Sequence, residues 1–250
     1  MTRRHRHAMT VESGGEPHAG LTEGPVQGDD VGRCPSCGAT RTGPYCAECG
    51  QRFLDGRHSL VSLVGGVVER LASLEHGLVH TLVRLVVDPG VVIRDYLAGR
   101  TVMYVHPFAY LIVGFGVFAL AWGWMGVGGG DMERWLFGIL VLFLAAASRL
   151  VFRRASMNYA EHLILNMFLY GQMVLFLTAG MVIVRTLPGV TRNVASVVVL
   201  VSVCGYLMWG YSRVFRGRRL LSALGGLVVL IAGTAVWAVA SLGIVQILRD

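Results

Sequence analysis

The chain has 250 residues, of which 54% are hydrophobic and 15% are charged, so it is more apolar than a soluble domain of this length. All 22 basic residues are arginines. The lack of lysine excludes a P-loop, which needs a lysine for its phosphates, and any enzyme that forms a Schiff base on a lysine amine. The net charge of +7 is unevenly distributed along the chain. Between Phe108 and Leu248 there are only three acidic residues, namely Asp131, Glu133 and Glu161.

Residues 1–33 contain few apolar side chains among many arginine, histidine, glycine and acidic residues. Such a composition cannot offset the entropy of ordering, so we predict a disordered, solvated tail rather than a nucleic-acid-binding arm. The opening MTRRHRH resembles the basic start of a signal peptide, but no apolar stretch follows it. The sequence therefore predicts an N-terminus that stays in the cytoplasm.

Four cysteines form two Cys-x2-Cys pairs, Cys34 with Cys37 and Cys46 with Cys49, separated by eight residues. This spacing is typical of a zinc ribbon, in which each pair forms one knuckle and all four sulfurs bind one zinc ion. A glycine follows the second cysteine of each pair and allows the chain to turn there. We predict a zinc ribbon over residues 34–51 that is folded by its metal, because it has almost no core of its own.

Other uses of the four cysteines are weaker. Two disulfides would need an oxidising compartment, against which the predicted cytoplasmic N-terminus argues. A redox-active pair would need a strand-to-helix junction, which the sequence does not indicate. Iron accepts the same ligands, and zinc is the metal that we favour for this motif. The fifth cysteine, Cys204, lies in an apolar run and is predicted to be a small core residue.

Residues 58–106 are predicted to form amphipathic helices at the membrane interface. Between residues 60 and 88, polar or small residues recur every three or four positions, which indicates one polar face of a helix. The stretch is long enough to span a bilayer, but its charged residues make spanning costly. A helix in the interface or under the membrane bundle fits better. Pro89-Gly90 ends this helix, and a short second helix is predicted over 91–98.

His76 and His80 lie four residues apart and therefore share one face of the predicted helix. This spacing allows both side chains to bind one metal ion, but the HExxH order of a zinc protease is absent. We regard the two histidines as a candidate metal site and favour their role as polar residues near lipid headgroups.

Residues 107–250 are predicted to form an all-α transmembrane domain. A span needs about 20 apolar residues, and the candidate stretches are 108–127, 135–152, 163–184, 194–212 and 220–248. The second has Arg149 near its end, from where the side chain can reach the interface. The predicted fold class is thus an all-α membrane helix bundle of about five transmembrane helices, preceded by a small zinc ribbon and an amphipathic interfacial helix.

The arginines favour one orientation of these spans. With the N-terminus inside, the cytoplasmic loops contain seven arginines and the segments on the opposite side contain four. Cytoplasmic loops of membrane proteins carry an excess of basic residues. We therefore predict a multi-pass inner-membrane protein with a cytoplasmic N-terminus and zinc ribbon, and with its C-terminus outside.

A set of features in order along the chain resembles the uncharacterised bacterial membrane proteins of domain-of-unknown-function family 3667. They are the Cys-x2-Cys-Gly knuckles ending in Gly50-Gln51, the stretch TLVRLVVDPGVVIRDYLAGR over 81–100, Tyr104, Pro107, and YAEHL over 159–163. The resemblance implies a zinc ribbon on a polytopic membrane domain, and it implies no established activity.

The best candidate site in the membrane domain is the stretch NYAEHLILNMFLY over residues 158–170. Glu161 is an isolated acid at the start of a span, and His162, Asn166 and Tyr170 recur every four residues as one polar stripe. Such a stripe can handle protons, a metal ion or a lipid headgroup. We favour the alternative that Glu161 pairs with an arginine seven or eight residues upstream and that the stripe joins helices.

Three classes of function remain. The first is a membrane protein whose partners are the lipid bilayer and a cytoplasmic protein, with the zinc ribbon as a partner-binding or regulatory module. The second is a transporter or metal sensor, although the chain shows no internal repeat. The third is a membrane-embedded enzyme acting on lipid. We favour the first and do not expect an enzyme, because the sequence has no GxSxG motif, no HExxH motif and no close carboxylate pair in its spans.

Overall fold

The structure is a computed structural model and describes residues 32–40, 43–53, 58, 77–126, 131–215 and 219–247. The helices in these residues are α3 (Leu78–Val87), α4 (Pro89–Leu97), α5 (Pro107–Trp124), α6 (Asp131–Val151), α7 (Tyr159–Arg185), α8 (Gly189–Val214) and α9 (Arg219–Ile247). Around the cysteines the backbone forms two isolated β-bridges, Arg33 with Thr40 and Tyr45 with Arg52. Most of the predicted tail, and residues 60–76 of the predicted interfacial helix, lie outside the described residues.

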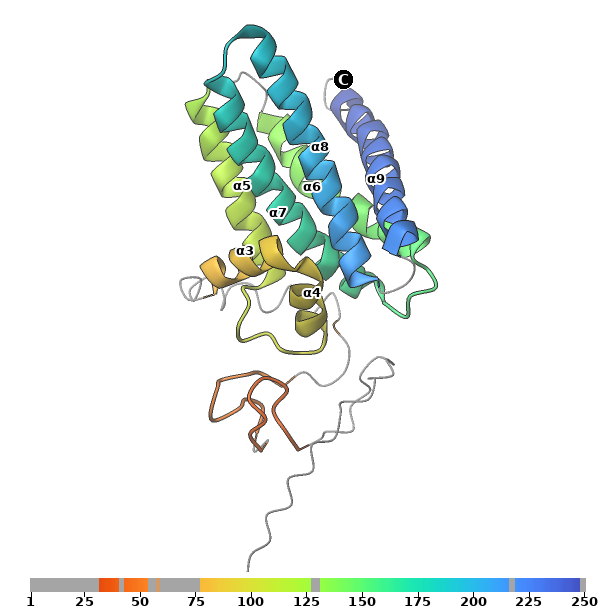
Figure 1. Cartoon of the computed structure of the whole chain (residues 1–250). Coiled ribbons are helices and arrows are strands. Elements are labelled where there is room, and N and C mark those ends of the chain that lie inside the picture. Colours follow the sequence, from red (N-terminus) through yellow and green to blue (C-terminus); the bar gives the residue numbers. More distant parts are fainter. Residues whose placement is uncertain are drawn as a thin grey trace, which may run out of the picture.

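Helix α7 is the centre of the bundle (Figure 1). It packs against α5, α6 and α8, while α9 lies against α6 and α8. Every residue from 160 to 172 in its N-terminal half is buried. Small residues let the helices approach closely: a Cβ atom on Gly114 of α5 would lie 3.1 Å from the carbonyl oxygen of Gly171 on α7. The polar residues in this half of α7 therefore face other helices.

Four helices, α5, α7, α8 and α9, are long and apolar enough to cross a membrane by length and composition. The prediction of five spans is wrong at the second stretch, 135–152. The apolar described part of α6 is Gly138–Val151, which rises by about 21 Å, whereas the hydrocarbon core of a bilayer is about 30 Å thick. Helix α6 still packs along α7 and α9. By length and composition about four helices can therefore span the membrane, while α6 returns the chain to the end of the bundle where α7 begins (Figure 1).

The short helices α3 and α4 lie at the end of the bundle where α5 and α7 begin and α8 ends (Figure 1). Asp88, between them, caps α4 by accepting hydrogen bonds from the backbone N–H groups of Gly90 and Val91. Its carboxylate forms an ion pair with Arg213 of α8, and Arg94 of α4 donates to the carbonyl oxygen of Arg213. Burial raises the pKa of Asp88, but the hydrogen bond and charge of Arg213 outweigh this and hold the pKa below its ordinary value. These contacts fix α4 against the end of α8.

Helix α3 buries Thr81 and Leu85 and presents valines outward. Thr81 is buried and its hydroxyl accepts a hydrogen bond from the backbone N–H of Val105 at 3.0 Å. Val79, Val83 and Val87 are 70%, 50% and 63% exposed. Leu85 on the inner side is fully buried and Arg84 is exposed, so both sides of the helix combine apolar and polar residues.

Candidate metal centre and buried polar cluster

The two cysteine pairs form knuckles with the same backbone geometry. The N–H of Gly38 donates to the carbonyl oxygen of Cys34, and that of Gly50 to the carbonyl oxygen of Cys46, both at 2.9 Å. The two glycines have positive φ angles, 77° and 71°, which residues with a side chain rarely adopt. The glycine after each pair therefore makes the turn that brings the two cysteines of the pair together.

The four sulfur atoms lie within 4.8 Å of one another. The Sγ atoms of Cys34 and Cys49 are 3.6 Å apart, and those of Cys37 and Cys46 are 3.5 Å apart. Thiolates at about 2.3 Å from a tetrahedral zinc ion would be about 3.8 Å apart, whereas sulfurs in a disulfide are about 2.0 Å apart. All four cysteines are free. The structure thus brings the predicted ligands together in a cluster that fits one four-coordinate metal ion.

The backbone of the second knuckle favours a thiolate at Cys46. The backbone N–H of Cys49 lowers the pKa of the Cys46 thiol, burial opposes this, and the resulting pKa is about 7. Burial raises the pKa of the Cys49 thiol to about 12. All four thiols can therefore be deprotonated together only when a cation offsets their negative charge. A metal ion that binds the four thiolates in this way also stabilises the fold of the module.

Gln51, directly after the second knuckle, ties the cysteine cluster to the loop between α4 and α5. Its side chain is fully buried, and Oε1 accepts hydrogen bonds from the hydroxyl of Ser36 at 2.9 Å and from the backbone N–H groups of Thr101 at 3.0 Å and Val102 at 3.2 Å. Its Nε2 donates to the hydroxyl of Thr101 at 3.0 Å and to the carbonyl oxygen of Arg52 at 2.7 Å. One side chain thus bonds both the first knuckle and the membrane domain.

His58 forms a second attachment. Its ring stacks on Tyr96 of α4 with 5.6 Å between the ring centroids, and its Nε2 donates to the carbonyl oxygen of Tyr96 at 3.2 Å. The carbonyl oxygen of His58 accepts a hydrogen bond from Nδ2 of Asn158 at 3.0 Å. Asn158 precedes α7, so this contact joins the chain after the ribbon to the start of the central helix.

Glu161 closes a capping box at the start of α7. Its N–H donates to Oδ1 of Asn158 at 2.9 Å, and its Oε2 accepts from the backbone N–H of Asn158 at 2.7 Å. These reciprocal bonds satisfy backbone N–H groups that a helix otherwise leaves without partners at its N-terminus. An isolated acid at this position is therefore explained by helix capping.

His162 and Asn166 of α7 join Ser148 of α6 and Tyr211 of α8 in a polar cluster, the name kept below for these four residues. Oγ of Ser148 lies 3.0 Å from Nδ1 of His162, and Nδ2 of Asn166 donates to Oγ of Ser148 at 2.9 Å. The hydroxyl of Tyr211 donates to Oδ1 of Asn166 at 2.6 Å. Each of the four residues is at most 2% exposed. The cluster links three helices inside the bundle.

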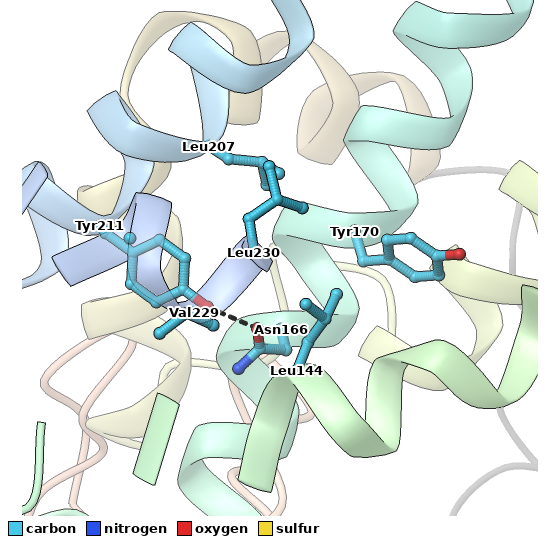
Figure 2. Close-up of a pocket in the computed structure, with 8 residues that line it drawn as sticks. Leu144, Asn166, Tyr170, Leu207, Tyr211, Val229 and Leu230 are labelled. Atoms are coloured by element: carbon cyan, nitrogen blue, oxygen red, sulfur yellow. Dashed lines mark hydrogen bonds between the residues drawn. The ribbon is translucent and has the colours of Figure 1, made fainter. Parts of the chain in front are cut away.

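Tyr170 lies on the same helix but turns away from Asn166 and Tyr211 (Figure 2). Its ring contacts Phe115 of α5, with 5.7 Å between centroids. A small pocket beside the cluster is lined by Leu144, Asn166, Tyr170, Leu207, Tyr211, Gly226, Val229 and Leu230. The structure therefore divides the predicted stripe, and it adds Ser148 and Tyr211, which sequence reasoning missed. A serine or tyrosine in an apolar helix gives little signal, because neither residue is unusual there.

The distance between Ser148 and His162 would suit a nucleophile and its base. However, Ser148 is fully buried and its hydroxyl also lies 2.9 Å from the carbonyl oxygen of Ala145. Nε2 of His162 is buried without a hydrogen-bond partner among the described residues, so no group there orients the ring as a catalytic base requires. The geometry is better suited to joining helices than to acyl transfer.

The predicted histidine pair is described only in part. His80 donates from Nδ1 to the carbonyl oxygen of Met103 at 3.0 Å, and its ring lies 5.6 Å from that of Tyr104. His76 lies outside the described residues. In the structure His80 thus holds the loop before α5.

We expect Glu161→Gln to leave the stability of the membrane domain nearly unchanged. Glutamine accepts the same hydrogen bond from the N–H of Asn158, and capping boxes use either residue. Glu161→Ala should lower the free energy of unfolding by about 1 kcal/mol through loss of that bond. Thermal unfolding of both variants in detergent measures the difference. An equal loss in the two variants would show that the charge of Glu161 matters more than its capping bond.

One segment of the chain matches a known protein family. Residues 75–119 match the model of a family described as "Protein of unknown function (DUF3667)". The matched segment contains α3, α4, the loop that binds Gln51 and the first part of α5. Searches of curated proteins and of solved structures gave no match. The resemblance predicted from the sequence is thus confirmed over residues 75–119, where the chain matches the DUF3667 model.

Proposed function

We propose that this protein is a multi-pass membrane protein whose cytoplasmic zinc ribbon is docked on the membrane domain and acts as a regulatory, partner-binding module. The observation that carries the proposal is the buried side chain of Gln51, which bonds Ser36 of the first knuckle and the backbone of Thr101 and Val102. A ribbon on a free tether needs no such contact. A docked ribbon has a fixed place from which its metal or a bound protein can act on the helices.

Zinc is the metal that we propose for the four cysteines. Four thiolates in a tetrahedral arrangement are a common structural zinc site, and the sulfur distances of 3.5 and 3.6 Å fit it. Zinc has no redox chemistry, so a zinc ribbon serves folding and binding rather than electron transfer.

The charge distribution supports a cytoplasmic place for the ribbon. Arg94 of α4 and Arg213 of α8 lie at the end of the bundle to which Gln51 attaches. The end of α6 and the start of α9 contribute further arginines to the loops that we assign to the inside, namely Arg149, Arg153, Arg154, Arg216, Arg218 and Arg219. An excess of basic residues marks the cytoplasmic side of membrane proteins.

The exposed valines of α3 support lipid as a partner. Val79, Val83 and Val87 form one apolar side of a helix that lies at the end of the bundle, and Arg84 beside them is exposed. A helix with an apolar side and basic residues suits the boundary between acyl chains and headgroups. We therefore place α3 in the cytoplasmic leaflet.

Reporter fusions test the orientation. A reporter joined after Gly128 should indicate the outside and one joined after Arg216 the inside, because α5 runs away from the end of the bundle that carries α3 and α4, α6 brings the chain back to it, and α8 ends there (Figure 1). A reporter at the N-terminus should match the one after Arg216. Signals from the same side at Gly128 and Arg216 would contradict the proposed orientation.

Limited proteolysis tests the docking of the ribbon. Gln51→Ala should keep the bound zinc but make cleavage by trypsin after the exposed Arg52 about tenfold faster, because several buried hydrogen bonds to the membrane domain are lost. Ser36→Ala is the matched control, since it removes only the bond between Gln51 and the knuckle. Equal cleavage rates in Gln51→Ala and the unaltered protein would show that the ribbon is not held by this side chain.

A further inference from the structure

We propose that metal occupancy of the four-cysteine site controls the order of the first turn of α7, through His58 and Asn158. The proposal rests on the proposed function, because it requires that the ribbon binds zinc. It adds a target inside the membrane domain: the capping box that begins the central helix, and with it the polar cluster.

The ribbon is the element with two states, folded when metal is bound and unfolded without it. Its buried residues in the described part of the chain are Cys34, Cys46 and Gln51, which is too small a core to fold without metal. Gln51 holds its place only when the second knuckle is formed, because its carbonyl oxygen accepts from the N–H of Cys46 at 2.8 Å. Loss of the metal therefore removes the anchor at Gln51.

Gln51 and His58, the two described anchor residues, are seven positions apart in the sequence. Seven residues of extended chain reach at most about 25 Å, so an anchored Gln51 restricts where His58 can lie. His58 is 7% exposed, stacked on Tyr96 and bonded through its carbonyl oxygen to Asn158. When Gln51 is released, His58 can move more freely. Its contacts with Tyr96 and Asn158 must then offset a larger loss of conformational entropy.

Asn158 can couple His58 to α7 because the oxygen and the nitrogen of its side-chain amide each form a hydrogen bond. Oδ1 accepts from the N–H of Glu161, and Nδ2 donates to the carbonyl oxygen of His58. Each contact needs that particular end of the amide, so the bond to His58 fixes the orientation in which Asn158 caps the helix. Aspartate keeps the acceptor for the cap and has no donor for His58, and serine keeps an acceptor but has no amide nitrogen at the position that reaches His58.

The first turn of α7 leads directly to the polar cluster. His162 follows Glu161, and its N–H donates to the carbonyl oxygen of Asn158 at 3.1 Å. The side chain of His162 contacts Ser148 at 3.0 Å, and its carbonyl oxygen accepts from Nδ2 of Asn166 at 2.7 Å. Loosening of the first turn therefore changes contacts between α6 and α7 without any movement of the distant ends of these helices.

Hydrogen exchange of the full-length protein in detergent tests the proposal. Zinc content is measured first, and exchange is then followed with zinc bound and after removal by a chelator. In the unaltered protein, zinc removal should make amides in residues 159–166 exchange about threefold to tenfold faster, the range expected for loss of one hydrogen bond. A peptide from the middle of α8 should not change.

The variant Asn158→Asp should retain one zinc and show the same exchange in residues 159–166 with and without the metal, because its cap no longer depends on His58. Asn158→Ser repeats the test if the aspartate variant does not fold. A protein without zinc overturns both the proposed function and this proposal. Bound zinc with unchanged exchange in α7, an equal rise in α8, or a zinc effect retained in both Asn158 variants overturns this proposal alone.

Discussion

Replacing Cys46 and Cys49 together by serine should reduce the zinc content of the purified full-length protein from about one ion per chain to none, because two neutral hydroxyls replace half of a four-thiolate site. The structure places all four sulfurs within 4.8 Å of one another, so each knuckle alone holds only half of the ligands. Since the metal supplies the folding energy of such a module, the ribbon should unfold as well. Elemental analysis of the protein after gel filtration measures the loss.

Cys204→Ser is the matched control for the cysteine variant. Cys204 lies in α8, away from the ribbon in sequence, and does not belong to the four-cysteine cluster. Its replacement should leave about one zinc per chain. Full zinc retention in the double variant, or an unaltered protein purified without zinc, would refute the metal assignment.

Gly90→Ala should destabilise the junction of α4 and α8 by about 2 kcal/mol, through overpacking against backbone that cannot move aside. A Cβ atom at this position would lie 2.5 Å from the carbonyl oxygen of Arg213 and 2.7 Å from its carbonyl carbon. To relieve the contact, α4 must move away from α8, which strains the ion pair of Asp88 with Arg213 and the hydrogen bond from Arg94. A loss of this size should lower the melting temperature by about 4–8 °C.

Gly116→Ala provides the matched control, because a Cβ atom on this exposed glycine of α5 meets nothing within 4 Å. The same chemical change in open space should stabilise the helix by about 0.5–1 kcal/mol. Melting temperatures of both variants in detergent should therefore shift in opposite directions. A similar rise in both would show that α4 does not approach α8 as closely as the structure indicates.

The segment that matches the DUF3667 model contains the residues that join α4 to α8. Asp88 caps α4 and forms an ion pair with Arg213. Gly90 has no side chain and so allows the backbone of α8 to lie close to α4. Arg94 donates a hydrogen bond to the carbonyl oxygen of Arg213. The backbone N–H of Thr101, in the same segment, donates a hydrogen bond to the side chain of Gln51. The segment thus contacts both the ribbon, through Thr101, and the end of α8.

The sequence by itself determined those features that depend on neighbouring residues. The Cys-x2-Cys-Gly pairs predicted the metal ligands because each knuckle is a local turn, and the positive φ angles of Gly38 and Gly50 agree with this. Long apolar stretches predicted α5, α7, α8 and α9 as spans because hydropathy accumulates along a single helix. The same reasoning failed at α6, where an apolar stretch ending near Arg149 is shorter than a bilayer requires.

Only the tertiary structure decided which distant residues meet. The sequence marked Glu161, His162, Asn166 and Tyr170 by their spacing, but spacing along one helix does not show which neighbouring helix each side chain faces. The cap that Glu161 forms with Asn158 is local, whereas packing joined His162 and Asn166 to residues of α6 and α8 and turned Tyr170 toward α5. The buried place of Gln51 against a loop 50 residues away was equally hidden, because hydrogen bonds between distant segments depend on the fold and leave no periodic pattern in the chain.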